Sequence, residues 1–244
     1  MDKAQKKLHR GEPIKLAELN MTPILLALFL GFVVVALFVI FRKRSSARRD
    51  ILLSGISDAG KSALFMQVLH NRFPETFTSI SENIGLYKKG NLSARLIDIP
   101  GHYRVREKSF EKYKRTSKAI AFVVDSVTIQ KEIRDVADAL YSVLTDSATV
   151  PCKVCIFCNK QDSTTAKSAE VIKSSLEKEL NLVRDTRSRK LQSTSDEENN
   201  KAVYLGKPGR DFEWSHLQQS ITFFEGSAKD GVLSDLTNWL EKML

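Results

Sequence analysis

From Asp50 to the end of the chain, short apolar runs alternate with longer segments in which apolar residues recur at helical spacing. Apolar runs of strand length predict buried strands, and the periodic segments between them predict helices. Strands separated by helices indicate an α/β fold with a mostly parallel central sheet flanked by helices. The strands are predicted at 51–55, 94–99, 120–125, 153–158 and 221–224, and the helices at 62–71, 129–145, 166–183 and 233–244.

An unbroken apolar run, Pro23–Phe41, precedes this alternating part. As a helix it would be about 28 Å long, close to the hydrocarbon thickness of a bilayer. A cleaved signal peptide has a shorter apolar region, of about 7–15 residues. The cations Arg42, Lys43 and Arg44 follow the run directly and favour a cytosolic C-terminal side. The sequence therefore predicts a polar tail (1–21), one transmembrane helix (22–41), a basic linker (42–48) and a folded domain (49–244).

Residues 184–210 interrupt the alternation with a polar stretch that contains few apolar residues. Such a composition buries too little apolar surface to order a segment by itself. We predict a flexible insertion loop there.

Charge and cysteine content narrow the class of protein. The 244 residues carry a net charge of +9, and the basic cluster beside the apolar run accounts for much of it. We therefore expect a lipid surface near this cluster and no direct contact with nucleic acid. The three cysteines, Cys152, Cys155 and Cys158, fit free thiols in a reducing compartment. On a strand, Cys155 would face away from the other two, which argues against a metal site.

The segment Gly55–Ser62 reads GISDAGKS and matches the phosphate-binding pattern G-x-x-x-x-G-K-[ST]. A predicted strand leads in and a predicted helix leads out, so backbone N–H groups and a helix N-terminus would face the phosphates. Lys61 should reach the β- and γ-phosphates, and the Ser62 hydroxyl should bind Mg²⁺. The expected nucleotide contacts here are Gly55, Ser57, Asp58, Ala59, Gly60, Lys61, Ser62 and Ala63.

Asp98 and Gly101 stand in the sequence DIPG at the end of another predicted strand. A carboxylate in this position can hold Mg²⁺ through a water molecule. The Gly101 backbone N–H can donate to a γ-phosphate. The pattern is common in turns, and its place after the phosphate loop gives it weight.

Asn159, Lys160 and Asp162 stand in NKQD, directly after the apolar strand VCIFC. The Asp162 carboxylate can accept hydrogen bonds from N1–H and the N2 amine of guanine. Adenine lacks these donors and would leave the carboxylate unpaired. Later in the chain, a loop with Ser227, Ala228 and Lys229 can present a backbone N–H to the guanine carbonyl. The sequence thus predicts binding of GTP or GDP with Mg²⁺, and it argues against an ATPase.

The four motifs stand in the order and rough spacing of the Ras-like small GTPases, so residues 49–244 resemble that family's G domain. The likeness is strongest to the Arf/Sar branch, because of Asp58, the spacing from Ser79 to Asp98 and the segment IPGHYRVR. The resemblance implies that Thr78 or Ser79 binds Mg²⁺. It also places His102 where relatives carry the glutamine that positions water, although a lone histidine is often only a surface residue.

An Arf/Sar-like G domain joined to an apolar anchor and a polar insertion is similar to a membrane-anchored receptor subunit. This resemblance implies a single-pass protein of the endoplasmic reticulum with a cytosolic G domain. It would hold the receptor's α subunit when GTP is bound, for co-translational protein targeting. Contact with ribosome or translocon would be indirect, and the lipid bilayer is the other expected partner.

Two alternatives stay open at this point. One is a scaffold that keeps GTP bound without hydrolysing it, because Ser57 and His102 both depart from the Ras pattern and put fast hydrolysis in question. The other is an Arf/Sar-like trafficking GTPase, whose reversible membrane attachment the apolar run opposes. The basic stretch Arg104–Arg115 is read as a solvated helix face.

Overall fold

The computed structural model describes residues 25–35, 48–75, 79–193 and 203–244. The chain divides into two compact units, Met1–Ala47 and Arg48–Leu244. In the first unit, residues 25–35 form a helix with mostly exposed side chains. Among the described residues, no helix combines the length and apolar character needed to cross a membrane. The predicted tail, most of the predicted linker and the remainder of the predicted 22–41 span lie outside the described residues.

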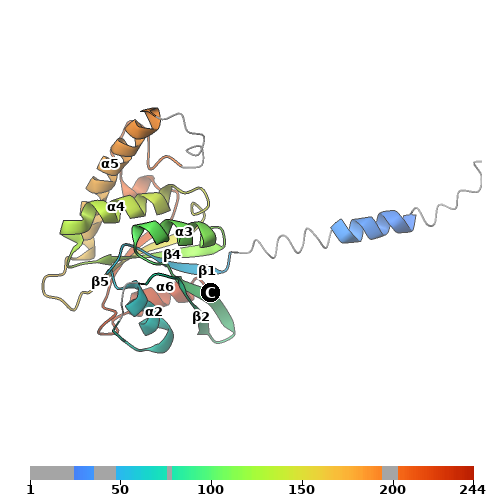
Figure 1. Cartoon of the computed structure of the whole chain (residues 1–244), viewed down its shortest axis with the longest axis horizontal. Helices are drawn as coiled ribbons and strands as arrows, with labels where there is room; N and C mark the ends of the chain where they lie inside the picture. The colour runs from blue at the N-terminus through green and yellow to red at the C-terminus, as the bar shows by residue number, and fades with distance from the viewer. Residues whose placement is uncertain (1–24, 36–47, 76–78, 194–202) are drawn as a thin grey trace, which may run out of the picture. The chain divides into compact units, whose positions relative to one another are not determined.

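The second unit is built on one six-stranded sheet in the order β2-β3-β1-β4-β5-β6 (Figure 1). Every neighbouring pair is parallel except β2 and β3, which form an antiparallel hairpin at one edge. The strands are β1 (Asp50–Ser54), β2 (Asn83–Lys89), β3 (Leu92–Asp98), β4 (Ser117–Asp125), β5 (Lys153–Asn159) and β6 (Ile221–Glu225).

Helices cover both faces of this sheet, as the layers in Figure 1 show. Residues of α2 and α6 pack in one apolar cluster, and residues of α3, α4 and α5 pack in the other. The predicted α/β architecture with a mostly parallel sheet is confirmed. The helices are α2 (Lys61–His70), α3 (Tyr103–Tyr113), α4 (Ile129–Thr145), α5 (Ala169–Ser193) and α6 (Ser234–Glu241), with a 3-10 turn at Trp214–His216.

Alternation along the central strands fills both clusters. Phe122 of β4 packs on the α3–α4–α5 side, and its neighbour Val123 packs on the α2–α6 side. The cysteines follow the same rule, because Cys152 and Cys158 face one cluster and Cys155 faces the other. All three are free and buried, and no group of three His, Cys, Asp or Glu side chains among the described residues is arranged to hold a metal ion. The three cysteines are therefore free thiols in the core, as the sequence predicts.

The periodicity did not predict β2 as a defined strand, and it predicted α3 only as a solvated helix face. β2 is an edge strand with most of its side chains exposed, so it has no apolar face for a period of two to mark. α3 is short and strongly basic, and only Ser109, Phe110 and Tyr113 in it are buried.

The predicted flexible loop at 184–210 is wrong for its first part, because α5 continues to Ser193. Arg187 donates hydrogen bonds of 2.6 and 3.1 Å to Asp138 of α4, which holds this extension against the neighbouring helix. After residues 194–202, which the structure does not describe, Leu205 and Phe212 are buried in the core. Contacts with residues far away in the sequence therefore order much of a segment that is polar by composition.

Shortening a core side chain tests this packing. Leu140 of α4 is fully buried in the larger cluster, so Leu140→Ala should lower the free energy of unfolding by about 2–5 kcal/mol. Urea denaturation followed by circular dichroism measures the loss. The matched control is Leu182→Ala in α5, since Leu182 is 56 % exposed, and it should cost less than about 1 kcal/mol.

Candidate functional site

The loop between β1 and α2 has the backbone geometry of a phosphate cradle. Asp58 and Gly60 have φ angles of 60° and 86°, so successive N–H groups turn toward the same side. Gly60 then directly precedes Lys61, the first residue of α2. A Cβ atom on Gly60 would lie 2.3 Å from Nδ2 of Asn159, so only glycine fits between these two motifs.

Lys61 points into the loop that it follows. Its Nζ donates to the Ile56 carbonyl at 2.6 Å, and the residue is only 6 % exposed. Burial is the main cause that lowers the pKa of Lys61 to about 8; the carboxylate of Asp98 opposes the change, Arg106 adds to it, and Asp58 also opposes it. Burial disfavours the charged form of this amine, so phosphate oxygens placed within the loop will stabilise that form.

Three oxygen-bearing side chains meet beside Lys61. The Ser62 hydroxyl donates to Asp98 at 2.6 Å and lies 3.0 Å from the Ser79 hydroxyl, and Asn83 donates to the same Asp98 oxygen at 3.0 Å. The second oxygen, Oδ1 of Asp98, is buried and has no hydrogen-bond partner among the residues that the structure describes. Burial raises the pKa of Asp98, while the hydrogen bonds from Ser62 and Asn83 and the charge of Lys61 act in the opposite direction.

Hydroxyl and carboxylate oxygens are the ligands that suit Mg²⁺, and a nucleotide phosphate and water would supply its other ligands. The unpaired Asp98 oxygen supports this fit, because a water on the metal could donate to it. Ser79 is therefore the residue that the structure brings to Ser62 and Asp98. The alternative, Thr78, lies outside the described residues.

Asp98→Asn tests the metal assignment. An amide cannot accept as strongly from a metal-bound water, and loss of such an outer contact typically weakens metal affinity about 10–100-fold. We expect the variant to bind GDP in EDTA as the unaltered chain does, but to gain little affinity when Mg²⁺ is added. Equilibrium binding of a fluorescent GDP across a Mg²⁺ titration measures this. An unchanged Mg²⁺ response would remove Asp98 from the metal site.

Gly101 brings the DIPG segment against the phosphate loop. A Cβ atom on Gly101 would lie 2.5 Å from the Ser57 backbone nitrogen and 2.6 Å from Lys61 Nζ. The backbone of Gly101 therefore reaches the place where the amine and the loop converge, as its predicted role at a γ-phosphate requires.

The NKQD and SAK segments form the opposite wall. Asn159 joins two loops, donating to the Ala59 carbonyl at 2.9 Å and accepting from the Ala228 N–H at 3.0 Å. The Asp162 carboxylate accepts from the Ser227 hydroxyl at 2.8 Å and lies 3.5 Å from the Lys229 amine. The hydrogen bond from Ser227 lowers the pKa of Asp162, and Lys229 adds to the effect. Asp162 is thus a fixed, ionised acceptor.

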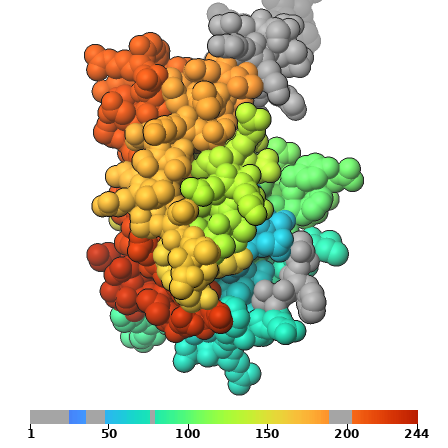
Figure 2. Space-filling model, turned by 90° about the vertical axis from the view of Figure 1, so that its left-hand side faces the viewer, coloured from blue at the N-terminus to red at the C-terminus, as the bar shows by residue number. Residues whose placement is uncertain are grey.

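These walls enclose one cavity of about 330 Å³ at the end of the sheet where β1, β3, β5 and β6 terminate. Figure 2 looks onto this end, where the yellow segment after β5 lies beside the red segment after β6. The cavity is lined by Ser57, Asp58, Gly60, Lys61, Ser62, Ala63, Phe73, Ser79, Ile99, Pro100, Gly101, Asn159, Lys160, Asp162, Ala228 and Lys229.

Three predicted contact residues lie behind the lining. Gly55 packs against the Val123 backbone, Ala59 is fully buried, and Ser227 donates a hydrogen bond to Asp162. They position the residues that face the cavity. His102 stands just before α3, is exposed and does not line the cavity in this structure.

Sequence reasoning missed Phe73 in the lining and Asn83 on Asp98. Phe73 follows α2 in an irregular stretch, and no motif marks it. Asn83 begins β2, so its role depends on the antiparallel pairing that sets it opposite Asp98.

Comparison with known proteins identifies the family. A family model for the signal recognition particle receptor beta subunit matches residues 46–221. The chain belongs to this family. The human signal recognition particle receptor subunit beta is 41 % identical over 245 residues, which cover 93 % of this chain and 89 % of the human protein.

Solved structures of the signal recognition particle (SRP) receptor agree with the fold. The structure of the mammalian SRP receptor superposes with a TM-score of 0.72 and 40 % identity, covering 80 % of this chain and 100 % of that one. The SRb-GTP/SRX complex of Chaetomium thermophilum gives a TM-score of 0.65 at 20 % identity, over 80 % of this chain and 100 % of that one, which shows the shared fold. The resemblance to Arf/Sar-like GTPases is thereby resolved to the SRP receptor beta family.

Proposed function

We propose that this chain is the membrane-anchored GTP-binding subunit of an SRP receptor. It holds the receptor's α subunit at the endoplasmic reticulum while GTP and Mg²⁺ are bound, and so supports co-translational protein targeting. The observation that carries the proposal is the convergence of Lys61 and Asp162 on one cavity, in a chain that belongs to the SRP receptor beta family. The amine suits phosphates and the carboxylate suits guanine.

Contacts within this domain can carry a GTP-dependent change from the nucleotide site to α3 and to the start of β2. Ser79 and Gly101 would each contact the metal or the γ-phosphate. Their segments are joined through Glu82, which accepts from the Tyr113 hydroxyl at 2.9 Å and from the Lys112 amine. A nucleotide that orders Ser79 and Gly101 therefore acts on α3 and on the start of β2 together.

Apolar side chains lie beside these contacts and support a protein partner. Ile80 is 83 % exposed, and Ile84 and Leu86 project from edge strand β2. Large apolar side chains grouped on a surface are typical of interaction sites. The Chaetomium structure is an SRb-GTP/SRX complex, and we assign the receptor's α subunit as the partner of these side chains.

The membrane anchor remains the run Pro23–Phe41, of which residues 25–35 are helical. Its length matches a bilayer, and the cations that follow it favour a cytosolic G domain. A trafficking GTPase with reversible attachment is disfavoured by such an anchor.

Capture of the α subunit tests the function. The full chain is reconstituted into proteoliposomes and loaded with either a non-hydrolysable GTP analogue or GDP, and the α subunit retained after flotation is measured. We expect retention to differ by about tenfold or more, the range of typical coupling free energies. Equal capture in both states would contradict GTP-dependent tethering. Release of the chain by alkaline carbonate would contradict the anchor.

The position of His102 favours one second candidate, a scaffold that keeps GTP intact. His102 is exposed and lies outside the cavity lining in this structure, so a water beside the γ-phosphate would need a movement of α3 to meet it. Single-turnover hydrolysis, with and without the α subunit, separates the two functions. If His102 positions water, His102→Ala will slow hydrolysis and leave GTP affinity unchanged.

A further inference from the structure

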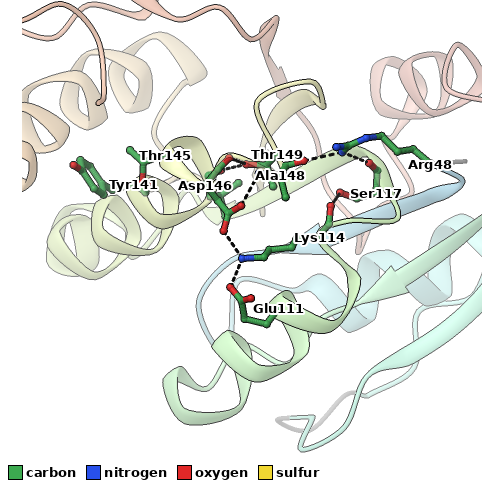
Figure 3. Close-up of polar contacts among 10 residues, drawn as sticks. Arg48, Glu111, Lys114, Ser117, Tyr141, Thr145, Asp146, Ala148 and Thr149 are labelled. Atoms are coloured by element: carbon green, nitrogen blue, oxygen red, sulfur yellow. Dashed lines mark hydrogen bonds and ion pairs between the residues drawn. The ribbon is translucent and has the colours of Figure 1, made fainter. Parts of the chain in front are cut away.

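The point where the chain enters the G domain is fixed by hydrogen bonds. Arg48, the first residue of the second unit, donates through Nη1 to the Ser117 carbonyl at 2.9 Å and to the Ala148 carbonyl at 2.7 Å (Figure 3). The Arg49 N–H donates to the Thr116 carbonyl at 2.8 Å. Thr116 and Ser117 lie at the start of β4, and Ala148 lies in the turn between α4 and β5. The chain therefore leaves the domain at a defined place, where β1 and β4 begin.

Several carboxylates at this end of the sheet pair with cations of the same domain. Asp50 accepts two hydrogen bonds of 2.7 Å from Arg95. Asp146 accepts from Lys114 at 2.6 Å, and Lys114 also pairs with Glu111 (Figure 3). Glu241, at the end of α6, pairs with Lys89. One amine, Lys114, is thus shared by two carboxylates, so one negative charge at this end is not compensated.

Cations at the same end stay exposed. Each has no ion-pair partner among the described residues. The strand register places four of them around the starts of β1, β4 and β5 and the β2–β3 turn, and the fifth directly follows α6, whose Glu241 pairs with Lys89 beside that turn. We call this set the basic end: Arg49, Lys88, Arg115, Lys153 and Lys242.

The basic end and the nucleotide cavity lie at opposite ends of the sheet. In parallel strands the amino ends share one edge, and the cavity is lined by loops at the carboxyl ends. A planar partner against the basic end would leave the cavity and the apolar side chains of β2 open.

We propose that the basic end rests on an anionic lipid surface, with Arg48 fixing the exit of the membrane linker. The inference depends on the membrane anchor of the proposed function. Residues 42–47 can span at most about 20 Å when fully extended, so a bilayer holding the preceding run must lie near Arg48. Lys and Arg side chains are attracted to anionic headgroups over about one Debye length, roughly 8 Å at physiological salt.

Nucleic acid is the other polyanion that a basic surface could bind. The covalent linker favours lipid, because it ties this end of the domain to a bilayer. Resting there would orient the domain with its nucleotide site toward the cytosol, ready for the α subunit.

Amide hydrogen exchange on the full chain tests the proposal. The GDP-loaded protein is placed in nanodiscs of phosphatidylcholine alone or with about 30 % phosphatidylserine. We expect the β2–β3 turn and the 114–118 turn to exchange at least about threefold more slowly on the anionic discs, with the difference removed by about 0.5 M salt. Lys88→Gln, Arg115→Gln and Lys153→Gln together should abolish this lipid-dependent protection.

The control variant removes the same charge elsewhere, at Lys131, Lys167 and Lys178, and should keep the protection. Equal exchange on both lipids, or equal loss in both variants, would overturn the proposal. Protection produced by added RNA and not by phosphatidylserine would also overturn it, in favour of a nucleic-acid partner. A chain that carbonate releases from the bilayer contradicts the anchor itself, whereas an anchored chain without protection contradicts only this inference.

Discussion

Replacing Asp162 by asparagine will lower the affinity for GTP by about 100-fold or more, and the variant will prefer xanthosine triphosphate. The carboxylate can accept two charge-assisted hydrogen bonds from guanine, each worth about 1.5–3 kcal/mol, and about 1.4 kcal/mol is a factor of ten. An asparagine offers one carbonyl acceptor and one amide NH₂ group. This NH₂ group would face the N2 amine of guanine, and both are donors. Xanthine carries a carbonyl at that position, which can accept from the asparagine NH₂.

Competition between labelled GDP and unlabelled GTP, XTP and ATP measures this preference. The matched control is Asp230→Asn, since Asp230 is an exposed carboxylate in the next turn of the same loop. Its side chain has no role in the cavity, so its affinity for GTP should stay within about twofold of the unaltered chain. If Asp162→Asn still selects GTP over XTP, the carboxylate does not read the base.

The sequence predicted most of the cavity because its residues follow strands. Lys61, Asp98 and Asp162 each stand just after or at the end of an apolar run, and the carboxyl ends of parallel strands meet at one edge. Chain order and strand ends were therefore sufficient to bring residues far apart in sequence into one site.

Contacts that depend on pairing between distant exposed segments were not predictable in this way. Glu82 meets Tyr113 and Lys112 only because β2 returns antiparallel to β3 and sets its start beside α3. Arg187 finds Asp138 only because α5 runs past its predicted end along α4. Both pairs join polar residues, so no hydrophobic period in either segment marks them.

The basic end could not be predicted from the sequence for the same reason. The cations of the basic end come from five separate segments, and only their common place at one end of the sheet makes them a surface. Arg48 shows the same point, since its acceptors at Ser117 and Ala148 lie 69 and 100 residues away in the chain.

Lys61→Met is expected to abolish detectable GTP binding at micromolar nucleotide, with a loss of at least about 100-fold in affinity. Methionine keeps most of the side-chain length but cannot donate to phosphate, and each such charged hydrogen bond contributes about 1.5–3 kcal/mol. Without nucleotide the variant should be at least as stable as the unaltered chain, because it no longer buries an amine. Urea denaturation of the nucleotide-free protein checks this, and Lys167→Met is the control for loss of charge nearby.

The pH dependence of GTP binding gives an independent measure of the same amine. Phosphate oxygens favour the ammonium form, so binding raises the pKa of Lys61 above its nucleotide-free value of about 8. Below that pH the amine is charged in both states, and it adds no pH dependence. As the pH rises from 8 toward the higher pKa of the complex, binding takes up a proton and affinity falls by about tenfold per pH unit. Isothermal titration in buffers of different ionisation enthalpy counts that proton. Absence of proton uptake by the unaltered chain at pH 9 would contradict this expectation, because it would show that Lys61 already carries its full charge before the phosphates arrive.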